Sequence, residues 1–274
     1  MANSNGWGDG ASNNNIGWGQ GADNVIGWGA SHSTSWAGST DIVGVTTPSF
    51  TNQYSMLLDG VDESINCGSF SAYDNGDLSV SIWIKKTTMG TLESAIRNTG
   101  SSSVAGFSII FENAFRKVAV ARRTRTSDTA TAYLDIGFTL DTWHNIAFTY
   151  KDSTRTLKVY RDGILQSTTI GSASTNTAST NLHIGSFNGA SNFLSGYMDE
   201  ISIFNSELSS TDISTIYNSG VPTDLTSLSP LSWWRMGDGD SWGGTNWTLI
   251  DNGSSGHNAT SINMEEADRT TDVP

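Results

Sequence analysis

The chain has 274 residues, a formal net charge of −13 and 15% charged residues, against a usual ~25%. This acidic balance disfavours nucleic acid as a main partner, because phosphate contacts need Lys and Arg. The single cysteine, Cys67, excludes an intrachain disulfide, and no run approaches the ~18 apolar residues of a membrane span. We therefore expect a polar protein that neither binds nucleic acid nor inserts into a membrane.

Residues 1–44 form a Gly-rich segment in which Gly-Trp-Gly occurs three times. The segment has too few apolar residues to bury a core of its own, so we expect its large rings to pack against something else. Two alternatives stay open: the segment seals the main domain, or it is an assembly or anchoring arm. Stacking on sugars is a third, less favoured use. The residues assigned to assembly are Trp7, Trp18, Trp28 and Trp36.

Residues 45–220 show the alternation of apolar and polar side chains that is typical of half-buried strands. Strands are predicted at 54–66 (a pair), 78–85, 107–111, 117–120 and 181–185. The residues of 78–85 that we predict to face inward are Leu78, Val80, Ile82 and Ile84.

Residues 143–163 read as two short strands and two turns. The first strand ends in a polar turn at 151–155, and the second ends at Asp162-Gly163. Asp-Gly between strands is a strong hairpin signal, because glycine accepts a positive φ without steric cost.

A short helix is predicted at 208–218. Ser209 or Ser210 can cap its N-terminus, and Gly220 with Pro222 stops it. The apolar stripe of this helix consists of Ile213, Ile216 and Tyr217.

Three segments together resemble the laminin G-like, concanavalin A-like jelly-roll family. They are 54–66, with its Asp-Gly-x-Asp turn; 143–163; and 193–217, with its Gly-x-x-Asp-Glu ending. The resemblance spans most of residues 50–220. It implies an all-β fold, an antiparallel β-sandwich of jelly-roll type with one short helix, and recognition at a surface.

Residues 221–274 are rich in tryptophan and resemble segments that follow laminin G-like domains in marine-phage virion proteins. We expect this segment to pack on the jelly roll, on a partner, or with the Gly-Trp-Gly-rich segment, which itself resembles N-termini of some tailed-phage structural proteins. The run 238–243 mimics the start of a calcium-binding loop, but Trp242 and Leu249 stand where that loop needs ligands. We interpret it as a turn.

Catalysis is not expected. Related glycan hydrolases carry a Glu-x-Asp-x-x-Glu strand, which this chain lacks. Asp199 and Glu200 are adjacent, so on a strand they are predicted to point to opposite faces, with Glu200 at the surface or an edge. His144 and His183 are predicted on a sheet surface, and the histidines show no zinc-binding spacing.

The basic run between Arg116 and Arg125 includes Arg122 and Arg123. At strand spacing it is most simply a solvated edge that discourages edge-to-edge pairing, and a contact with an acidic partner or glycan is the alternative.

Calcium is the one cofactor that the resemblance suggests, because relatives often bind it near a rim. Its predicted ligands are the carboxylates of Asp59, Asp62 and Asp199. The alternative is an Asp-Gly turn that caps its own backbone.

The resemblance implies a phage virion structural protein, a fibre, spike or capsid decoration, that adheres to host-surface glycans. The start of the chain lacks a signal peptide, so we expect assembly in a host cytoplasm and location in the virion. Other virion proteins and further copies of the chain, as a trimer, are the expected partners. The main alternative is a purely architectural capsid or tail component; a polysaccharide-degrading enzyme is less favoured.

Overall fold

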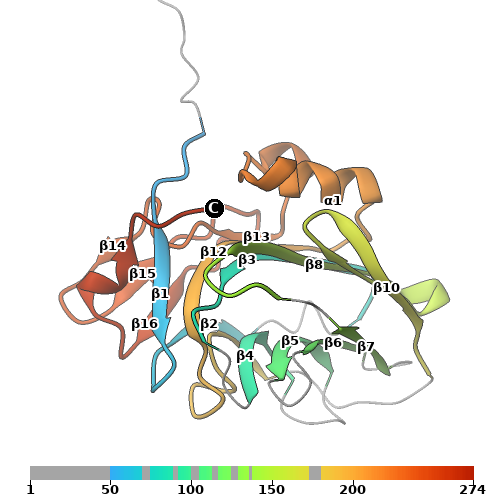
Figure 1. The fold of residues 1–274 in the computed structure, drawn as a ribbon, viewed down its shortest axis with the longest axis horizontal. Helices are drawn as coiled ribbons and strands as arrows, with labels where there is room; N and C mark the ends of the chain where they lie inside the picture. Colours follow the sequence, from blue (N-terminus) through green and yellow to red (C-terminus); the bar gives the residue numbers. More distant parts are fainter. Residues whose placement is uncertain are drawn as a thin grey trace, which may run out of the picture. The chain divides into compact units, whose positions relative to one another are not determined.

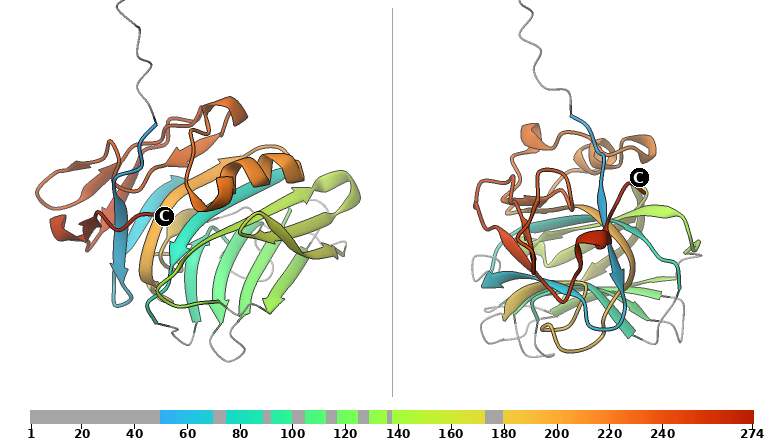
Figure 2. Two further views of the ribbon diagram at one scale, coloured as in Figure 1. Left: turned by 45° about the horizontal axis from the view of Figure 1, so that its top comes forward. Right: turned by 90° about the vertical axis from the view of Figure 1, so that its left-hand side faces the viewer.

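Two antiparallel sheets pack face to face in the computed structural model (Figures 1 and 2). Residues 50–274 form a unit of their own. The four tryptophans assigned to assembly, Trp7, Trp18, Trp28 and Trp36, lie outside the described residues. The structure describes residues 50–69, 75–88, 92–99, 105–112, 117–124, 129–135, 138–172 and 180–274.

The first sheet has eight strands among the described residues, in the order β10-β9-β8-β3-β12-β1-β17, with β13 paired to β12. Its strands are β1 (Ser55–Asp59), β3 (Leu78–Lys85), β8 (Trp143–Lys151), β9 (Thr156–Arg161), β10 (Ile164–Ile170), β12 (Ser195–Phe204), β13 (Ser232–Trp234) and β17 (Arg269–Thr270).

The second sheet has nine strands over the described ranges, in the order β14-β15-β16-β2-β11-β4-β5-β6-β7. Its strands are β2 (Ser64–Ser69), β4 (Leu92–Arg97), β5 (Gly106–Glu112), β6 (Lys117–Arg123), β7 (Thr129–Asp135), β11 (Asn181–Ile184), β14 (Ser241–Trp242), β15 (Trp247–Leu249) and β16 (Ala259–Ile262). The predicted antiparallel β-sandwich is confirmed.

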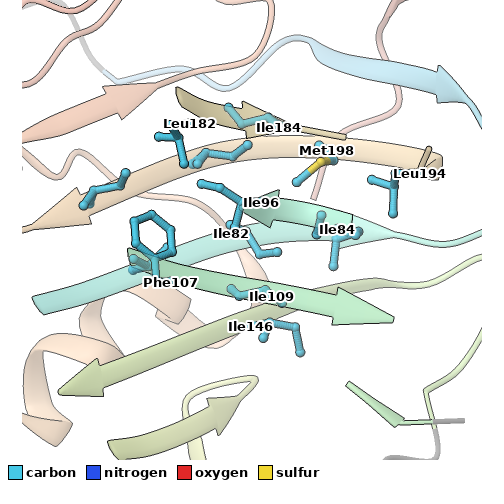
Figure 3. Close-up of a cluster of buried hydrophobic side chains, with 14 of the residues drawn as sticks. Ile82, Ile84, Ile96, Phe107, Ile109, Ile146, Leu182, Ile184, Leu194 and Met198 are labelled. Atoms are coloured by element: carbon cyan, nitrogen blue, oxygen red, sulfur yellow. The ribbon is translucent and has the colours of Figure 1, made fainter. Parts of the chain in front are cut away.

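The main core lies between the sheets (Figure 3). The four alternating residues of β3 all belong to it, as predicted from their period of two. They meet residues of the opposite sheet, among them Ile96, Phe107 and Ile109. Burial of such side chains contributes roughly 1.5–3 kcal/mol each, so this interior is the main source of stability.

The hairpin prediction for 143–163 is confirmed. β8 and β9 are joined by a 3-10 turn at Asp152–Thr154, and β9 passes to β10 through Asp162-Gly163. The φ angles of Asp162 and Gly163 are 51° and 75°. Two successive positive φ values suit the right-handed twist of the strands that flank a two-residue hairpin turn.

The helix prediction is also confirmed. α1 (Ser210–Tyr217) begins with a capping box between Ser209 and Asp212, so two N-terminal amide groups are satisfied. Ile213 and Ile216 are buried in a second, smaller cluster with residues of β8, β9, β12 and β13, on the side of the eight-stranded sheet away from the main core (Figure 1). No helix among the described residues is long and apolar enough to span a membrane.

The C-terminal segment contributes strands to both sheets. β13 pairs with β12, β16 with β2, and β17 with β1. Trp234 and Trp247 are buried in the main core, where their ring nitrogens donate to backbone carbonyls. Residues 221–274 are therefore part of the sandwich.

The interpretation of the basic run as a solvated edge is wrong. β6 pairs with β5 on one side and β7 on the other, so it is not an edge strand. Arg122 is fully buried, and its guanidinium donates to the carbonyls of Gly76 and Gly106. Arg122 thus closes one end of the core, while Arg123 lies on the opposite face of β6.

Candidate functional site

A row of polar side chains crosses the outer face of the nine-stranded sheet. In the strand registers, Asn66 of β2 lies opposite His183 of β11, His183 opposite Arg97 of β4, and Arg97 opposite Ser108 of β5. The preceding row, which includes Ile96 and Ile109, points into the core. Because side chains alternate along a strand, the polar row faces away from the core.

Arg97 is held in place by its neighbours. Its Nε donates to the carbonyl and the hydroxyl of Thr99 at 2.7 and 3.2 Å. Its guanidinium lies 4.0 Å from the centre of the Phe187 ring, a cation–π contact. Among the described residues, neither Nη nitrogen has a hydrogen-bond acceptor and no carboxylate forms an ion pair with this guanidinium. Arg97 therefore presents fixed, available donors.

Arg123 adds a second positive charge to this face. It lies opposite Gly106, two positions along β5 from Ser108, so it shares the outer face with Arg97. Burial, and then the charge of Arg123, hold the pKa of Arg97 below its usual range. Two guanidinium groups are thus kept near each other.

His183 stands beside Arg97 in the row. The side chain is 6% exposed, and burial holds the pKa of the imidazole below its usual value, so the ring is neutral at pH 7. Its Nδ1 has no hydrogen-bond partner among the described residues. Gly189, in the loop after β11, packs beside this imidazole, so the nitrogen is enclosed by the fold.

The loop after β11 carries Phe187 to this face. Phe187 and Ser191 form an isolated antiparallel bridge, and the carbonyl of Asn192 accepts a hydrogen bond from the amide of Ser94 in β4. The loop is therefore tied to the sheet that it borders. Ser108 and His183 are 1% and 6% exposed, so the half-buried guanidinium of Arg97 is the fixed group of this face that can donate to a polar ligand. We name Arg97, Arg123, His183, Phe187 and Ser108 the arginine face.

A hollow of about 480 Å³ lies elsewhere, on the outer side of the eight-stranded sheet. Tyr160, Leu165 and Leu208 line it, and the Lys158–Glu207 ion pair of 2.9 Å lies at its border. Because Lys158 and Glu207 neutralise each other, this pair gives the hollow no net charge, whereas the arginine face carries two positive charges.

The three predicted calcium ligands are not brought together. Asp59 lies opposite Ser195, whereas Asp199 lies four residues further along β12, roughly 13 Å at strand spacing. The Oδ1 of Asp59 accepts a hydrogen bond from the amide of Val61 at 2.7 Å, which is the self-capped turn. Asp62 follows in that turn. No group of three His, Cys, Asp or Glu in the described part could hold a metal, so these residues do not fit a shared calcium.

The prediction that Glu200 is a surface or edge carboxylate is wrong, since Glu200 is 2% exposed. A bulge in β12 interrupts the alternation, and Glu200 takes a φ of 44°. The carboxyl group of Glu200 accepts hydrogen bonds from the side chains of Trp233 and Arg235. Asp199 is fully buried and accepts a hydrogen bond from Asn52 at 2.8 Å. Both carboxyl groups are enclosed by packing.

Burial raises the pKa values of both carboxyl groups. It raises the pKa of Glu200 to about 7 against the opposing effect of Arg235, and raises that of Asp199 well above its usual range. The raised pKa values therefore result from burial in the folded chain, since neither carboxyl group is exposed to solvent.

The histidine prediction is wrong for His144. Its register partner Ile84 belongs to the core, and the imidazole lies 4.7 Å from the ring of Phe138. Its Nδ1 is 2.8 Å from Oδ2 of Asp162. His183 is on a sheet face as predicted, but it is nearly covered. The prediction of a turn at 238–243 holds for its start, where the chain bends at Asp238 and Gly239, and is wrong for Ser241–Trp242, which form β14.

Sequence reasoning missed Arg97 and Phe187. Neither lies in a motif, and the strand that carries Arg97 was not predicted. For the basic run, the alternative prediction from the sequence is contact with an acidic partner or glycan. Of the residues in that run, Arg123 is the one that lies on the arginine face.

The two packed antiparallel sheets define a β-sandwich of the concanavalin A-like type. Residues 59–214 match the family model described as the Concanavalin A-like lectin/glucanases superfamily. The match covers more than half of the chain, so the protein belongs to this superfamily. No curated protein matches the sequence significantly.

Solved structures are similar in fold at low sequence identity. A protein from Bacteroides ovatus, to which carbohydrate binding has been ascribed, aligns with a TM-score of 0.60 at 12% identity. The alignment covers 81% of this chain and 60% of that protein, so the chain spans less than two thirds of its length. Domain 4 of AbnA, a GH43 extracellular arabinanase from Geobacillus stearothermophilus, aligns with a TM-score of 0.49 at 16% identity, over 60% of this chain and 76% of that one.

Proposed function

We propose that this protein is a non-catalytic glycan-binding component of a phage virion, displayed as a fibre, spike or capsid decoration. The arginine face is the proposed contact with host-surface glycans. The observation that carries this proposal is Arg97, fixed by Thr99 and Phe187, with no carboxylate partner in the described structure. Membership of a lectin and glucanase superfamily supports recognition of carbohydrate, and the enclosed state of Asp199 and Glu200 supports binding without hydrolysis.

The virion location rests on the resemblance of the two flanking segments to those of phage structural proteins. In a virion, several copies of the chain, as a trimer, would bind a glycan surface together. Linking weak sites in this way raises the overall affinity by mass action alone.

A panel of host-surface polysaccharides and oligosaccharides tests glycan binding, with the full-length protein presented in its native oligomeric state. We expect saturable binding to at least one glycan, unchanged by chelator, because Asp59, Asp62 and Asp199 do not converge. Chelator-sensitive binding would revive the calcium hypothesis, and release of new reducing ends would support an enzyme. Mass spectrometry of purified particles tests the virion location.

A purely architectural role is the second candidate, and the edge strand β10 favours it. Ile164, Leu165 and Ile170 of β10 are 66%, 50% and 75% exposed. An edge strand with exposed apolar side chains is a template for pairing with another chain. A folded, oligomeric protein that binds no glycan of the panel would favour this role.

A further inference from the structure

We infer that Lys85, Trp143 and Tyr197 form a second binding site, for the carboxylate of a sugar acid, and that Asp272 of the same chain occupies this site in the structure. We name the first three residues the lysine clamp. They lie on the eight-stranded sheet, so the site is separate from the arginine face and does not depend on it.

The strand registers place the three side chains of the lysine clamp in one row. Lys85 of β3 lies opposite Trp143 of β8 and opposite Tyr197 of β12. Ile84 points into the core, so Lys85 points away from it. Trp83, on the same face as Lys85, stacks on the last residue of α1, which covers this side of the sheet (Figure 1). The lysine clamp therefore lies outside the sandwich, on the side of α1.

Two donors of the lysine clamp bind the two oxygens of one carboxylate. The indole Nε1 of Trp143 donates to Oδ1 of Asp272 over 3.0 Å, and Nζ of Lys85 donates to Oδ2. Although burial raises it, these hydrogen bonds hold the pKa of the Asp272 carboxyl below its usual range, so the clamp favours the ionised form. An ammonium and an indole N–H at fixed positions thus recognise a carboxylate by its charge and by its geometry.

The aromatic rings hold the ammonium and offer flat faces to a sugar. Nζ of Lys85 lies 4.4 Å from the centre of the Tyr197 ring and 5.7 Å from that of Trp143, and these cation–π contacts fix the charge before a ligand arrives. The two rings lie 6.3 Å apart, and both are partly exposed. Flat apolar faces beside a charge suit the apolar face of a sugar ring that carries a carboxylate. A sugar acid is therefore favoured over an acidic peptide, whose carboxylates are carried on flexible chains.

Asp272 fills the lysine clamp from the solvent side. Its side chain is 42% exposed, whereas that of Lys85 beneath it is 12% exposed. Residues 271–274 form no helix or strand, and within the described structure their hydrogen bonds to the sheet all run through Asp272. A partly exposed ion pair of this kind contributes little to stability. A ligand carboxylate whose sugar ring also covers the aromatic rings can therefore replace that of Asp272.

The test measures the affinity of the full-length protein for methyl glucuronide and methyl glucoside by nuclear magnetic resonance titration. The two sugars differ only in a carboxylate that stands in place of a hydroxymethyl group. Asp272→Ala should raise the affinity for the glucuronide about tenfold, because a clamp that is open in about one molecule in ten lowers the apparent affinity by that factor. Asp77→Ala, which frees Lys151 from an ion pair of 2.5 Å, is the matched control and should leave the affinity unchanged.

Further variants of the Asp272→Ala protein test the donors one at a time. This protein should bind the glucuronide about tenfold more tightly than the glucoside, because hydrogen bonds to a charged group are the stronger ones. Trp143→Phe keeps an aromatic ring and removes the N–H, so it should weaken glucuronide binding several-fold. Lys85→Gln should abolish the preference for the glucuronide, and Arg97→Gln should leave that preference unchanged.

Equal binding of the two sugars by the Asp272→Ala protein, or binding of neither, would overturn the inference and leave the lysine clamp as an anchor for residues 271–274. Glucuronide binding that Arg97→Gln weakens and Lys85→Gln does not would also overturn it, and would assign this ligand to the arginine face. Because Lys85, Trp143 and Asp272 lie apart from the arginine face, failure of the lysine clamp leaves the proposed glycan function standing.

Discussion

The guanidinium of Arg235 donates from Nε to Oε1 of Glu200 over 3.0 Å, and Glu200 is almost completely buried. The pair joins the C-terminal segment to the bulge of β12. Arg235 also lies over the ring of Phe50, at 4.3 Å, and donates to the carbonyl of Thr51. One side chain thus ties the first described residues, β12 and the C-terminal segment together.

At pH 8, substitution of Arg235 by Met should lower the free energy of unfolding by roughly 3 kcal/mol, because Glu200 must then stay charged without its counter-ion or take up a proton. Urea titration followed by tryptophan fluorescence measures the change. Adding Glu200→Gln should recover part of the loss. Arg161→Met serves as the control, since its contact with Asp162 is longer, at 3.7 Å, and more exposed. An equal effect of the two arginine substitutions would contradict this role for Arg235.

Stability should be higher near pH 5 than near pH 8. Burial raises the pKa of Glu200 from 4.5 to about 7 and that of Asp240 from 3.8 to about 6. A carboxyl with a raised folded pKa contributes stability that is fully present below its unfolded pKa and is lost as the pH rises through the folded value. The loss should therefore fall mainly between about pH 5 and pH 7.5, and its size should be on the order of 1–3 kcal/mol.

His183 opposes this trend at the acidic end, because its pKa is lowered by burial and its contribution is lost as the pH falls. Unfolding titrations at a series of pH values measure the profile. Glu200→Gln should flatten the slope above about pH 5. A profile that rises towards pH 8 in the unsubstituted protein would contradict the assignment.

Removal of residues 221–274 should abolish cooperative folding. β12, β2 and β1 would each lose one pairing strand, namely β13, β16 and β17, and the core would lose Trp234 and Trp247. Loss of a single buried tryptophan side chain costs about 3–5 kcal/mol, which alone approaches the stability of many domains. Denaturant titration of residues 50–220 beside 50–274 makes the comparison. A cooperative transition of equal midpoint in both would show that the jelly roll folds without the segment.

The edge strand β10 offers a test of the architectural alternative. If copies of the chain associate through it, Ile164→Lys or Ile170→Lys should convert the oligomer to monomer, because a charge on an edge opposes pairing. Analytical ultracentrifugation of the full-length chain measures this. Val61→Lys is the matched control, since Val61 is 68% exposed in a turn after β1. An oligomer that persists in both β10 variants would exclude this edge as the interface.

The regular elements could be predicted because they depend on local patterns. The alternation in 78–85, the Asp162-Gly163 turn and the Ser209 cap each specify a conformation over a few residues, and the structure has all three. The bulge at Glu200 could not be predicted in this way, since one extra residue in β12 depends on how two partner strands pair with it.

The arginine face escaped prediction for a related reason. Arg97, Arg123 and His183 meet only through the registers of β4, β5, β6 and β11. A period-two pattern says which residues share a face of one strand, but it does not say which strands are neighbours. For the same reason, Arg122 was wrongly predicted to lie at a solvated edge. The residue is buried because β6 lies between β5 and β7 in the sheet.

The central claim is that glycan is bound by the outer face of the nine-stranded sheet. The most direct measurement is the affinity of the full-length protein for its best glycan in four single variants, with folding checked by circular dichroism. Arg97→Ala and Phe187→Ala should each lower the affinity about tenfold, because they remove the fixed donor and the ring that holds it. Lys158→Ala and Leu165→Ala, in the hollow of the other sheet, should leave it unchanged. Loss of affinity in the second pair with none in the first would contradict the claim and move the binding site to the eight-stranded sheet.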